Sequence, residues 1–257
     1  MKNNLFIIIQ ARMTSTRLPK KVMLPLCGKT VLEIVIDRLG KYKNNIIIAT
    51  TDDGTENPII EICKKANVKY YKGSTNNVLE RYYKSAKEHG AKEHDLIIRI
   101  TSDCPLIDSF MMEKVISMYN NGNYDYVSNR IKRTVPIGLD VEVFNFKLLE
   151  QIYYNATLDF EKEHVTPYVY LSHKNKYKIG SFEDDEDNSH YRLTLDEEKD
   201  YIVIKEVYKK FNNSTDFTYK ELISMLQEND YIRQINLSVQ QKEATSVAIK
   251  KGENNGL

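Results

Sequence analysis

The chain has 257 residues, 41% of them hydrophobic and 28% charged, with 37 lysines and arginines against 36 aspartates and glutamates. A net charge of +1 argues against a general nucleic-acid binder, because such proteins gain affinity from a basic surface that releases counterions from phosphates. The length allows one large domain with a hydrophobic core of its own, so the fold needs no disulfide or metal scaffold.

The sequence gives no sign of export or of a membrane partner. Cys27, Cys63 and Cys104 form no C-x-x-C pair, which argues against a zinc knuckle and a disulfide framework. The first apolar run, Leu5–Ile9, is too short for a signal-peptide core or a membrane span. We therefore expect a protein of the reducing cytoplasm.

Apolar runs alternate with helix-like segments in the first half of the chain. The runs are rich in β-branched residues and lie at Leu5–Ile9, Ile46–Ala49, Val68–Tyr71 and Leu96–Ile100. A capping box at Thr30 and Glu33 predicts the start of one helix. Further helices are predicted from residue 58 or 59 to 66, from 77 to 88, and after Asp108 or Ser109. Unbroken hydrophobicity suits parallel strands covered on both faces, so we expect an α/β fold with a doubly wound, mostly parallel sheet.

After residue 121 the pattern predicts a mixed sheet. Strands are expected at Tyr124–Ser128, Leu139–Phe144, Tyr177–Phe182 and Tyr191–Leu195. Helices are expected at Phe146–Ala156, Asp196–Phe211 and Thr218–Glu228. We expect a single domain over residues 1–236, with halves of about 1–121 and 122–236. Residues 237–257 are rich in Gln, Lys, Asn and Gly and are expected to form a mobile tail.

A cluster of cations follows the first predicted strand. Residues 1–32 hold six cations and no acid, and Arg12, Arg17, Lys20 and Lys21 fall within ten residues. Ligands of open α/β sheets bind at the carboxyl ends of strands, where cations and backbone N–H groups suit a polyphosphate. The alternative is a solvated basic loop, and the glycine patterns of Walker A and Rossmann loops are absent. Because the cluster lies at a strand end and prolines stiffen the chain there, a binding site of defined shape is favoured over a solvated loop.

Five segments resemble the motifs of one enzyme family. The loop Ile-Ile-Gln-Ala-Arg-Met-Thr-Ser-Thr-Arg-Leu-Pro-Lys-Lys-Val at 8–22, followed by Gly28 and Lys29, resembles the signature loop of the cytidylyltransferases that activate acidic sugars. It is most similar to the spore-coat-polysaccharide type, whose relatives make CMP-sialic acid and CMP-Kdo. Further motifs of the family are matched in order at 99–108, 136–144, 162–168 and 192–196. The loop departs from the family at Thr14 and Lys20, where glycine is usual, and the fourth motif at Lys162, where arginine is usual.

The resemblance implies a fold, a reaction and a cofactor. The fold would be that of the nucleotide-diphospho-sugar transferases, with a nucleotide-binding first half and an acceptor or dimer second half. The reaction would transfer CMP from CTP to an acidic sugar or related anionic acceptor, with release of pyrophosphate, for a surface polysaccharide or glycan. Mg²⁺ would be held by Asp103 and Asp196, although each of these acids could instead cap a helix. A homodimer is also implied.

The same resemblance and the positions at strand ends give a set of candidate site residues. Those expected to bind the nucleotide are Gln10, Ala11, Arg12, Ser15, Arg17, Lys21, Thr51, Asp52, Arg81 and Ser102. Those expected to face the acceptor are Asn129, Arg130, Asp140, Glu142 and His164. Arg12, Lys21 and Asp103 are expected to act on the reacting phosphate, and no general base is assigned.

Ordinary structural roles remain open as alternatives for several of these residues. Thr51 and Asp52 precede a glycine and suit an ordinary turn, Arg81 suits an exposed helix position, and His164 suits a structural role. Two other functions also remain: a glycosyltransferase of related fold, and a non-catalytic nucleotide-binding protein.

Overall fold

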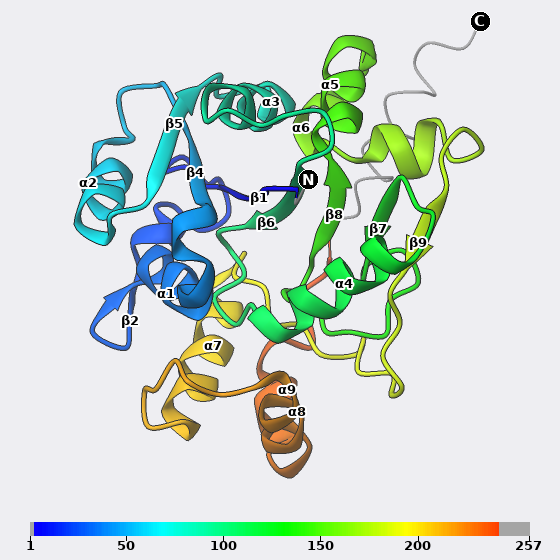
Figure 1. Ribbon diagram of the computed structural model, residues 1–257. Coiled ribbons are helices and arrows are strands. Elements are labelled where there is room, and N and C mark those ends of the chain that lie inside the picture. The colour runs from blue at the N-terminus through cyan, green and yellow to red at the C-terminus, as the bar shows by residue number, and fades with distance from the viewer. Residues whose placement is uncertain (1–2, 242–257) are drawn as a thin grey trace, which may run out of the picture.

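A seven-stranded sheet crosses the molecule in the computed structural model, which describes residues 3–241 (Figure 1). The first half contributes four parallel neighbours, β5 (Lys69–Gly73), β4 (Ile46–Thr51), β1 (Leu5–Gln10) and β6 (Leu96–Thr101). The second half adds β8 (Glu142–Asn145), β7 (Tyr126–Ser128) and β9 (Ile179–Ser181). Strand β8 is antiparallel to both β6 and β7, whereas β7 and β9 are parallel. The predicted fold class and the mixed second half are confirmed.

Helices cover both faces of the parallel strands, which explains their unbroken hydrophobicity. On β1, Ile7 and Ile9 pack into one core and Ile8 into another, because successive side chains point to opposite faces. The first core contains side chains of α1 (Val31–Arg38), α2 (Asn57–Ala66) and α4 (Ser109–Asn121). The second contains side chains of α3 (Val78–Glu88) and α5 (Phe146–Asn155).

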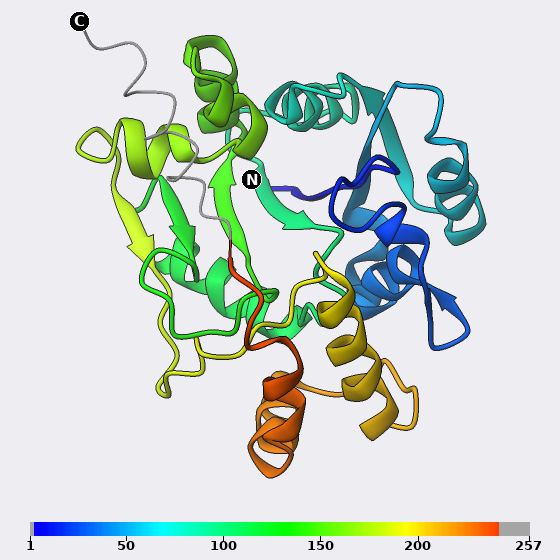
Figure 2. The same cartoon turned by 180° about the vertical axis from the view of Figure 1, so that it is seen from behind.

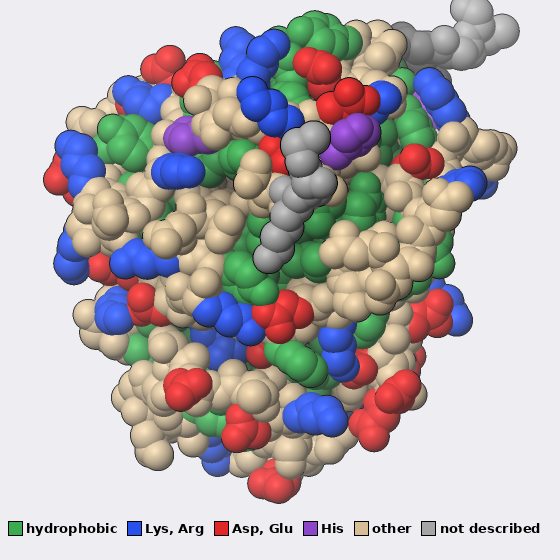
Figure 3. All heavy atoms as spheres, in the orientation of Figure 1, with side chains coloured by type: hydrophobic (Ala, Val, Ile, Leu, Met, Phe, Trp, Pro, Cys, Tyr) green, Lys and Arg blue, Asp and Glu red, His purple; other side chains and the backbone are tan. Residues whose placement is uncertain are grey.

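A third core joins the C-terminal helices to the outer side of α1 and α4. These helices are α7 (Glu198–Lys210), α8 (Tyr219–Glu228) and α9 (Tyr231–Asn236), and both views place them together below the sheet (Figures 1 and 2). Acidic and basic side chains are interspersed on the face seen in Figure 3, as expected for a chain with balanced charge. None of the helices within residues 3–241 has the length and hydropathy that a membrane span requires.

Four of the predicted helix starts are confirmed by side-chain caps, whereas the helix predicted from Asp196 begins at Glu198. Thr30 and Glu33 form a capping box at α1, and the side chains of Asn77 and Asp108 cap α3 and α4. The Thr218 hydroxyl caps α8 in the same way.

Several short elements were not predicted. They are the 3₁₀ turns η1 (Lys21–Met23) and η2 (Gly40–Asn45), the ribbon of β2 (Pro25–Leu26) and β3 (Lys29–Thr30), α6 (Asp159–His164), the π-turn η3 (Tyr168–Ser172), and α9. Cys27 and Gly28 make the turn of the ribbon with positive φ at both positions, as a two-residue hairpin loop requires. Elements of two to six residues carry too few side chains to show a period.

The prediction of a strand at Tyr191–Leu195 is wrong. Its alternating apolar side chains pack into the third core, but its backbone joins loops instead of the sheet. Leu193 N–H donates to the carbonyl of Ile137 at 2.7 Å, and Leu195 N–H donates to the carbonyl of Asp103 at 2.8 Å. The segment therefore ties together two loops that lie far apart in the sequence.

The start of the predicted tail contacts the fold. Lys199 Nζ donates to Ser238 Oγ at 2.8 Å, and Val239 N–H donates to the carbonyl of Asn236 at 2.9 Å. The rest of that prediction, residues 242–257, lies outside the described part of the chain.

Lys20 adopts a left-handed backbone conformation, with φ 55° and ψ 27°, directly before η1. We predict that Lys20→Gly raises the free energy of unfolding by up to about 1 kcal/mol, because glycine lacks the Cβ that makes this conformation costly. The matched control is Thr14→Gly, the other position where the family loop has glycine. Thr14 has no positive φ, so glycine there only adds freedom to the unfolded chain and should destabilise the fold. Urea unfolding measures both changes, and equal effects of the two variants would contradict the explanation.

Candidate active site

A cleft of about 830 Å³ opens where β1 and β6 end. The chain continues from β1 to β4 on one side and places β6 on the other, so the cleft lies at a switch point of the sheet, where open α/β folds bind ligands. Most of the candidate residues line it: Gln10, Ala11, Arg12, Ser15, Arg17, Lys21, Arg81, Ser102, Asp103, Arg130, Asp140, Glu142, His164 and Asp196.

Three candidates lie elsewhere. Thr51 is buried at the end of β4, and Asp52 is exposed in the turn that follows. Asn129 is buried and shapes the loop before β8, because its Nδ2 donates to the carbonyl of Leu139 at 2.8 Å and its Oδ1 accepts from Val141 N–H at 2.9 Å. The structure thus gives Asn129 a structural role at the edge of the site.

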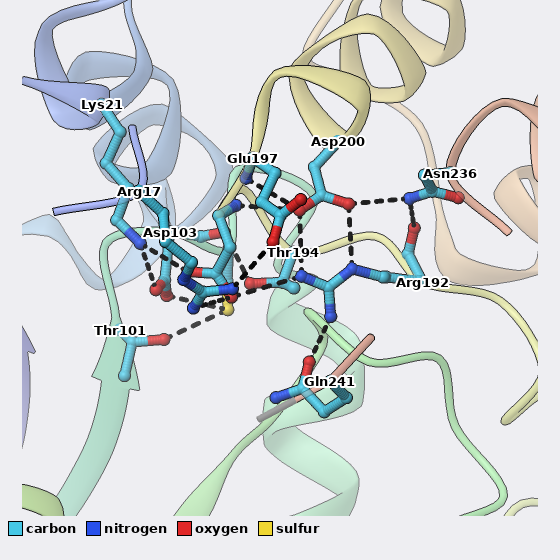
Figure 4. Close-up of polar contacts among 12 residues, drawn as sticks. Arg17, Lys21, Thr101, Asp103, Arg192, Thr194, Glu197, Asp200, Asn236 and Gln241 are labelled. Carbon is cyan, nitrogen blue, oxygen red and sulfur yellow. Dashed lines mark hydrogen bonds and ion pairs between the residues drawn. The ribbon is translucent and has the colours of Figure 1, made fainter. Parts of the chain in front are cut away.

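Lys21 connects two acids from distant parts of the sequence (Figure 4). Its Nζ lies 2.7 Å from Oδ2 of Asp103 and 2.9 Å from Oδ1 of Asp196. Although burial acts in the opposite direction, the two carboxylates raise the pKa of Lys21. Burial alone would raise the pKa of Asp103, but the ammonium group of Lys21 outweighs burial and lowers that pKa. Both acids therefore point at a single cation.

The other oxygen of Asp196 is held by two arginines. Its Oδ2 lies 3.0 Å from Nη2 of Arg17 and 3.3 Å from Nη2 of Arg192. Arg17 also lies 3.6 Å from Glu197 through Nη1. The carboxylate of Asp196 is thus fixed from one side while its Oδ1 faces Lys21.

The segment 191–195 brings the two acids together. Besides the Leu195 bond, the Thr194 hydroxyl donates to the carbonyl of Asp103 at 3.3 Å. Gly138 allows the neighbouring loop to approach, because a Cβ there would lie 2.4 Å from the carbonyl carbon of Leu193. The bonds from Leu195 and Thr194 to the carbonyl of Asp103 lie outside the sheet and join the two segments that carry Asp103 and Asp196.

The donor set of these acids fits Mg²⁺. Magnesium is commonly bound by one or two carboxylates, with water and phosphate oxygens completing its shell. Within residues 3–241, no group of three or more His, Cys, Asp or Glu side chains is arranged to hold a metal. Asp103 and Asp196 supply two carboxylates of this kind.

A buried charge cluster forms the opposite wall of the cleft. The carboxylate of Glu142 is 1% exposed and accepts from Arg99 Nη1, Arg130 Nη1 at 3.2 Å, Tyr126 Oη at 2.8 Å and the Thr166 hydroxyl. Burial would raise the pKa of Glu142, but the two guanidinium groups lower it to about 2. Two arginines against one carboxylate leave this cluster with a net positive charge.

A strained turn places His164 in the cleft. Val165 is buried with φ 70° and ψ −66°, and Thr166 N–H donates to the carbonyl of His164 at 2.9 Å, which is a γ-turn. This conformation is costly for a β-branched residue and persists only where the surroundings enforce it. Burial lowers the pKa of His164, so its ring is neutral near pH 7.

Arg81 is a buried cation, contrary to the exposed helix position that the sequence also allowed. It is 1% exposed, and its Nη1 donates to the carbonyls of Ser74 at 2.5 Å and Thr75 at 3.2 Å. Burial lowers its pKa to about 10. Arg81 and the exposed Arg12 both line the cleft, and within residues 3–241 neither forms an ion pair with an acid.

Sequence reasoning missed Arg99 and Arg192 as site residues, although both lie in recognised motifs. Arg99 stands in an otherwise apolar strand, where a charge is costly unless it is paired. Its Nη2 donates to Oε1 of Gln10 at 3.0 Å and so links β6 to the end of β1. A lone charge in a buried strand was the available signal.

Comparison with known proteins agrees with this geometry. A sequence model of a family described as cytidylyltransferase matches residues 6–244. An uncharacterized protein of Methanocaldococcus jannaschii is 37% identical over 244 residues, which cover 93% of this chain and 97% of that protein. The spore coat polysaccharide biosynthesis protein SpsF of Bacillus subtilis is 34% identical over 238 residues, covering 88% of this chain and 95% of that protein.

Solved structures share the fold. A cytidylyltransferase from Leptospira borgpetersenii superposes with a TM-score of 0.85 at 35% identity, covering 94% of this chain and all of that one. A CMP:2-keto-3-deoxy-manno-octonic acid synthetase in complex with CTP superposes with a TM-score of 0.60 at 14% identity, covering 81% of this chain, and shows similarity of fold alone.

The buried cluster gives a stability prediction. Glu142→Gln should lower the free energy of unfolding by about 3–5 kcal/mol, because Arg99 and Arg130 lose their buried counter-charge. The control Asp140→Asn should cost less than about 1 kcal/mol, since the Asp140–Arg133 pair is partly exposed.

The same variant has a defined pH dependence. A carboxylate with a lowered pKa stabilises the fold fully above its unfolded pKa, about 4.3 for glutamate, and loses this contribution as the pH falls toward its folded value. For Glu142 the folded value is about 2. Urea unfolding of wild type and Glu142→Gln should therefore give curves whose difference shrinks as the pH falls below about 4.3. A difference that does not change with pH would contradict the assigned charge state.

Proposed function

Because the chain belongs to the cytidylyltransferase family, we propose that it transfers CMP from CTP to an acidic sugar or a related anionic acceptor and releases pyrophosphate. The observation that carries the proposal is the meeting of Lys21, Asp103 and Asp196 in the cleft at the switch point of the sheet. The reaction joins an acceptor oxygen to the α-phosphorus of CTP and breaks the bond to pyrophosphate in line. Such a step needs positioning and charge stabilisation more than covalent help.

We propose that the basic loop holds the triphosphate. Arg12, Arg17 and Lys21 line the same cleft and offset its negative charge, and Arg81 adds a buried guanidinium. Mg²⁺ is the proposed cofactor, held by Asp103 and Asp196, and when bound it supplies charge neutralisation and orients the attacking oxygen. Lys21 contacts these same carboxylates, so its ammonium group would move to a phosphate oxygen when the carboxylates bind a metal.

The acceptor side supports an anionic substrate. Arg99, Arg130 and Glu142 together carry one net positive charge beside His164, so a carboxylate or phosphate of the acceptor could bind to this cluster. The name of the Bacillus subtilis relative supports a surface polysaccharide or glycan as the destination. The homodimer and the cytoplasmic location stay predictions.

Pyrophosphate release separates this proposal from a non-catalytic nucleotide binder. We expect release only when CTP is combined with an anionic acceptor, in a panel of CTP, UTP, ATP and GTP against sugar acids and small phosphorylated acids. Phosphate contacts alone do not distinguish the four nucleotides, so a preference for CTP would indicate a pocket that recognises cytosine. Binding of CTP without any release across the panel would support the non-catalytic alternative and refute the enzyme.

The cation site gives a second prediction. Lys21→Ala leaves Asp103 and Asp196 facing each other without their cation, so Mg²⁺ should bind this variant without CTP and raise its Tm by several degrees. The Tm of wild type should rise less on adding Mg²⁺, because the ion must first displace Lys21. CMP transfer by the variant should fall about 100-fold to 1,000-fold.

Lys20→Ala is the matched control. Lys20 is exposed and forms no ion pair within residues 3–241, so its removal should change neither the response to Mg²⁺ nor the rate appreciably. Equal Mg²⁺ responses of wild type and Lys21→Ala in thermal melts would show that the two acids do not form a shared cation site.

A further inference from the structure

The C-terminal end of the described chain reaches the active site. Gln241 lines the cleft, and its Oε1 accepts a hydrogen bond from Nη1 of Arg192 (Figure 4). Arg192 also donates from Nη2 to Oδ2 of Asp196 at 3.3 Å. The last described residue is therefore linked through a single side chain to a proposed metal ligand.

Arg192 has a partner for each nitrogen of its guanidinium group. Its Nε and Nη2 lie 2.9 Å from Oδ1 and Oδ2 of Asp200, which is fully buried. Oδ2 of Asp200 also accepts from the backbone N–H groups of Asp196 at 3.1 Å and Glu197 at 3.0 Å. Two planar groups joined by paired bonds hold each other in a fixed orientation. The pair thereby sets both the backbone and the side chain of Asp196.

Residues 236–241, which we call the C-terminal latch, are anchored to this pair. Asn236 is 3% exposed, and its Nδ2 donates to the carbonyl of Arg192 at 3.0 Å and to Oδ1 of Asp200 at 2.9 Å. Ser238 is held by Lys199. These bonds direct the chain back over the pair, so that Gln241 meets the remaining Nη1 of Arg192.

We propose that the C-terminal latch positions Asp196 for the metal and the triphosphate, with Gln241 as a positioning residue that acts through Arg192. The inference rests on the proposed function, because it takes Asp196 as a metal ligand. Asp196 offers Oδ1 toward Lys21 while Arg17 and Arg192 hold Oδ2, so the direction of the carboxylate depends in part on Arg192. Without Gln241, Nη1 of Arg192 loses its partner beside the cleft, and the guanidinium keeps only its bonds to Asp200 and Asp196.

The test measures Mg²⁺-dependent CTP binding by isothermal titration calorimetry in the full-length chain, without acceptor. Partners of a metal ligand typically tune metal affinity by about 10–100-fold, and Gln241 lies one contact further out, so Gln241→Ala should raise the Mg²⁺ concentration for half-maximal CTP affinity about threefold to tenfold. Its Tm should stay close to that of wild type because the Arg192–Asp200 pair is intact. Arg192→Lys, which keeps the charge but loses the fork, should produce a larger increase.

Two further variants separate positioning from a general structural effect. Gln241→Glu keeps an acceptor oxygen for Arg192 but adds a charge to the cleft, so its Mg²⁺ dependence should lie closer to that of wild type than to that of Gln241→Ala. Gln240→Ala removes the same side chain from the neighbouring position, which does not line the cleft, and should have no effect.

Wild-type Mg²⁺ dependence in Gln241→Ala would overturn the inference and leave the proposed function standing. A change equally large in Gln240→Ala or in Gln241→Glu would overturn it as well. If wild type itself binds no CTP at saturating Mg²⁺, both the proposed function and the inference fail.

Discussion

Two carboxylates that lie close together in a partly buried cleft require a cation between them, because like charges there repel strongly and resist ionisation together. In this protein the carboxylates are Asp103 and Asp196, and Lys21 supplies the cation. The surrounding parts serve this arrangement: the loop after β1 delivers Lys21, the end of β6 delivers Asp103, and the backbone bond from Leu195 to Asp103 brings the second acid into reach. The site is thus preorganised for a cation before any ligand arrives.

The sequence predicts the first half of the fold well and the second half less well. Buried parallel strands have long apolar runs, and Thr30, Asn77 and Asp108 mark helix starts by chemistry that acts within a single turn. The segment Tyr191–Leu195 alternates like a strand only because one side of it packs into the third core, and its hydrogen-bond partners are loops that no local pattern reveals. Val165 adopts a conformation that its residue type disfavours, so only its tertiary surroundings explain it.

The same distinction applies to the site. Residues directly after β1 and β6 were predictable, because strand ends meet at one edge of a sheet, but Thr51 and Asp52 at the end of β4 lie outside the cleft. The pairing of Arg99 with Glu142 depends on the register of β6 and β8, which place these residues opposite each other. Asn129 stood beside true cleft residues in the sequence yet serves the loop backbone. The contact of Gln241 with Arg192 was hidden, because the composition of its segment indicated a mobile tail.

We propose that Asp103 and Asp196 form one cation site, which Lys21 fills at rest and a metal shares with the nucleotide. Anomalous diffraction from crystals grown with CTP and Mn²⁺, which replaces Mg²⁺ at oxygen ligands, would locate the metal. We expect one manganese peak in contact with both carboxylates and with phosphate oxygens, and Lys21 Nζ in contact with a phosphate. Manganese bound elsewhere, with Lys21 still joining Asp103 and Asp196, would contradict this proposal.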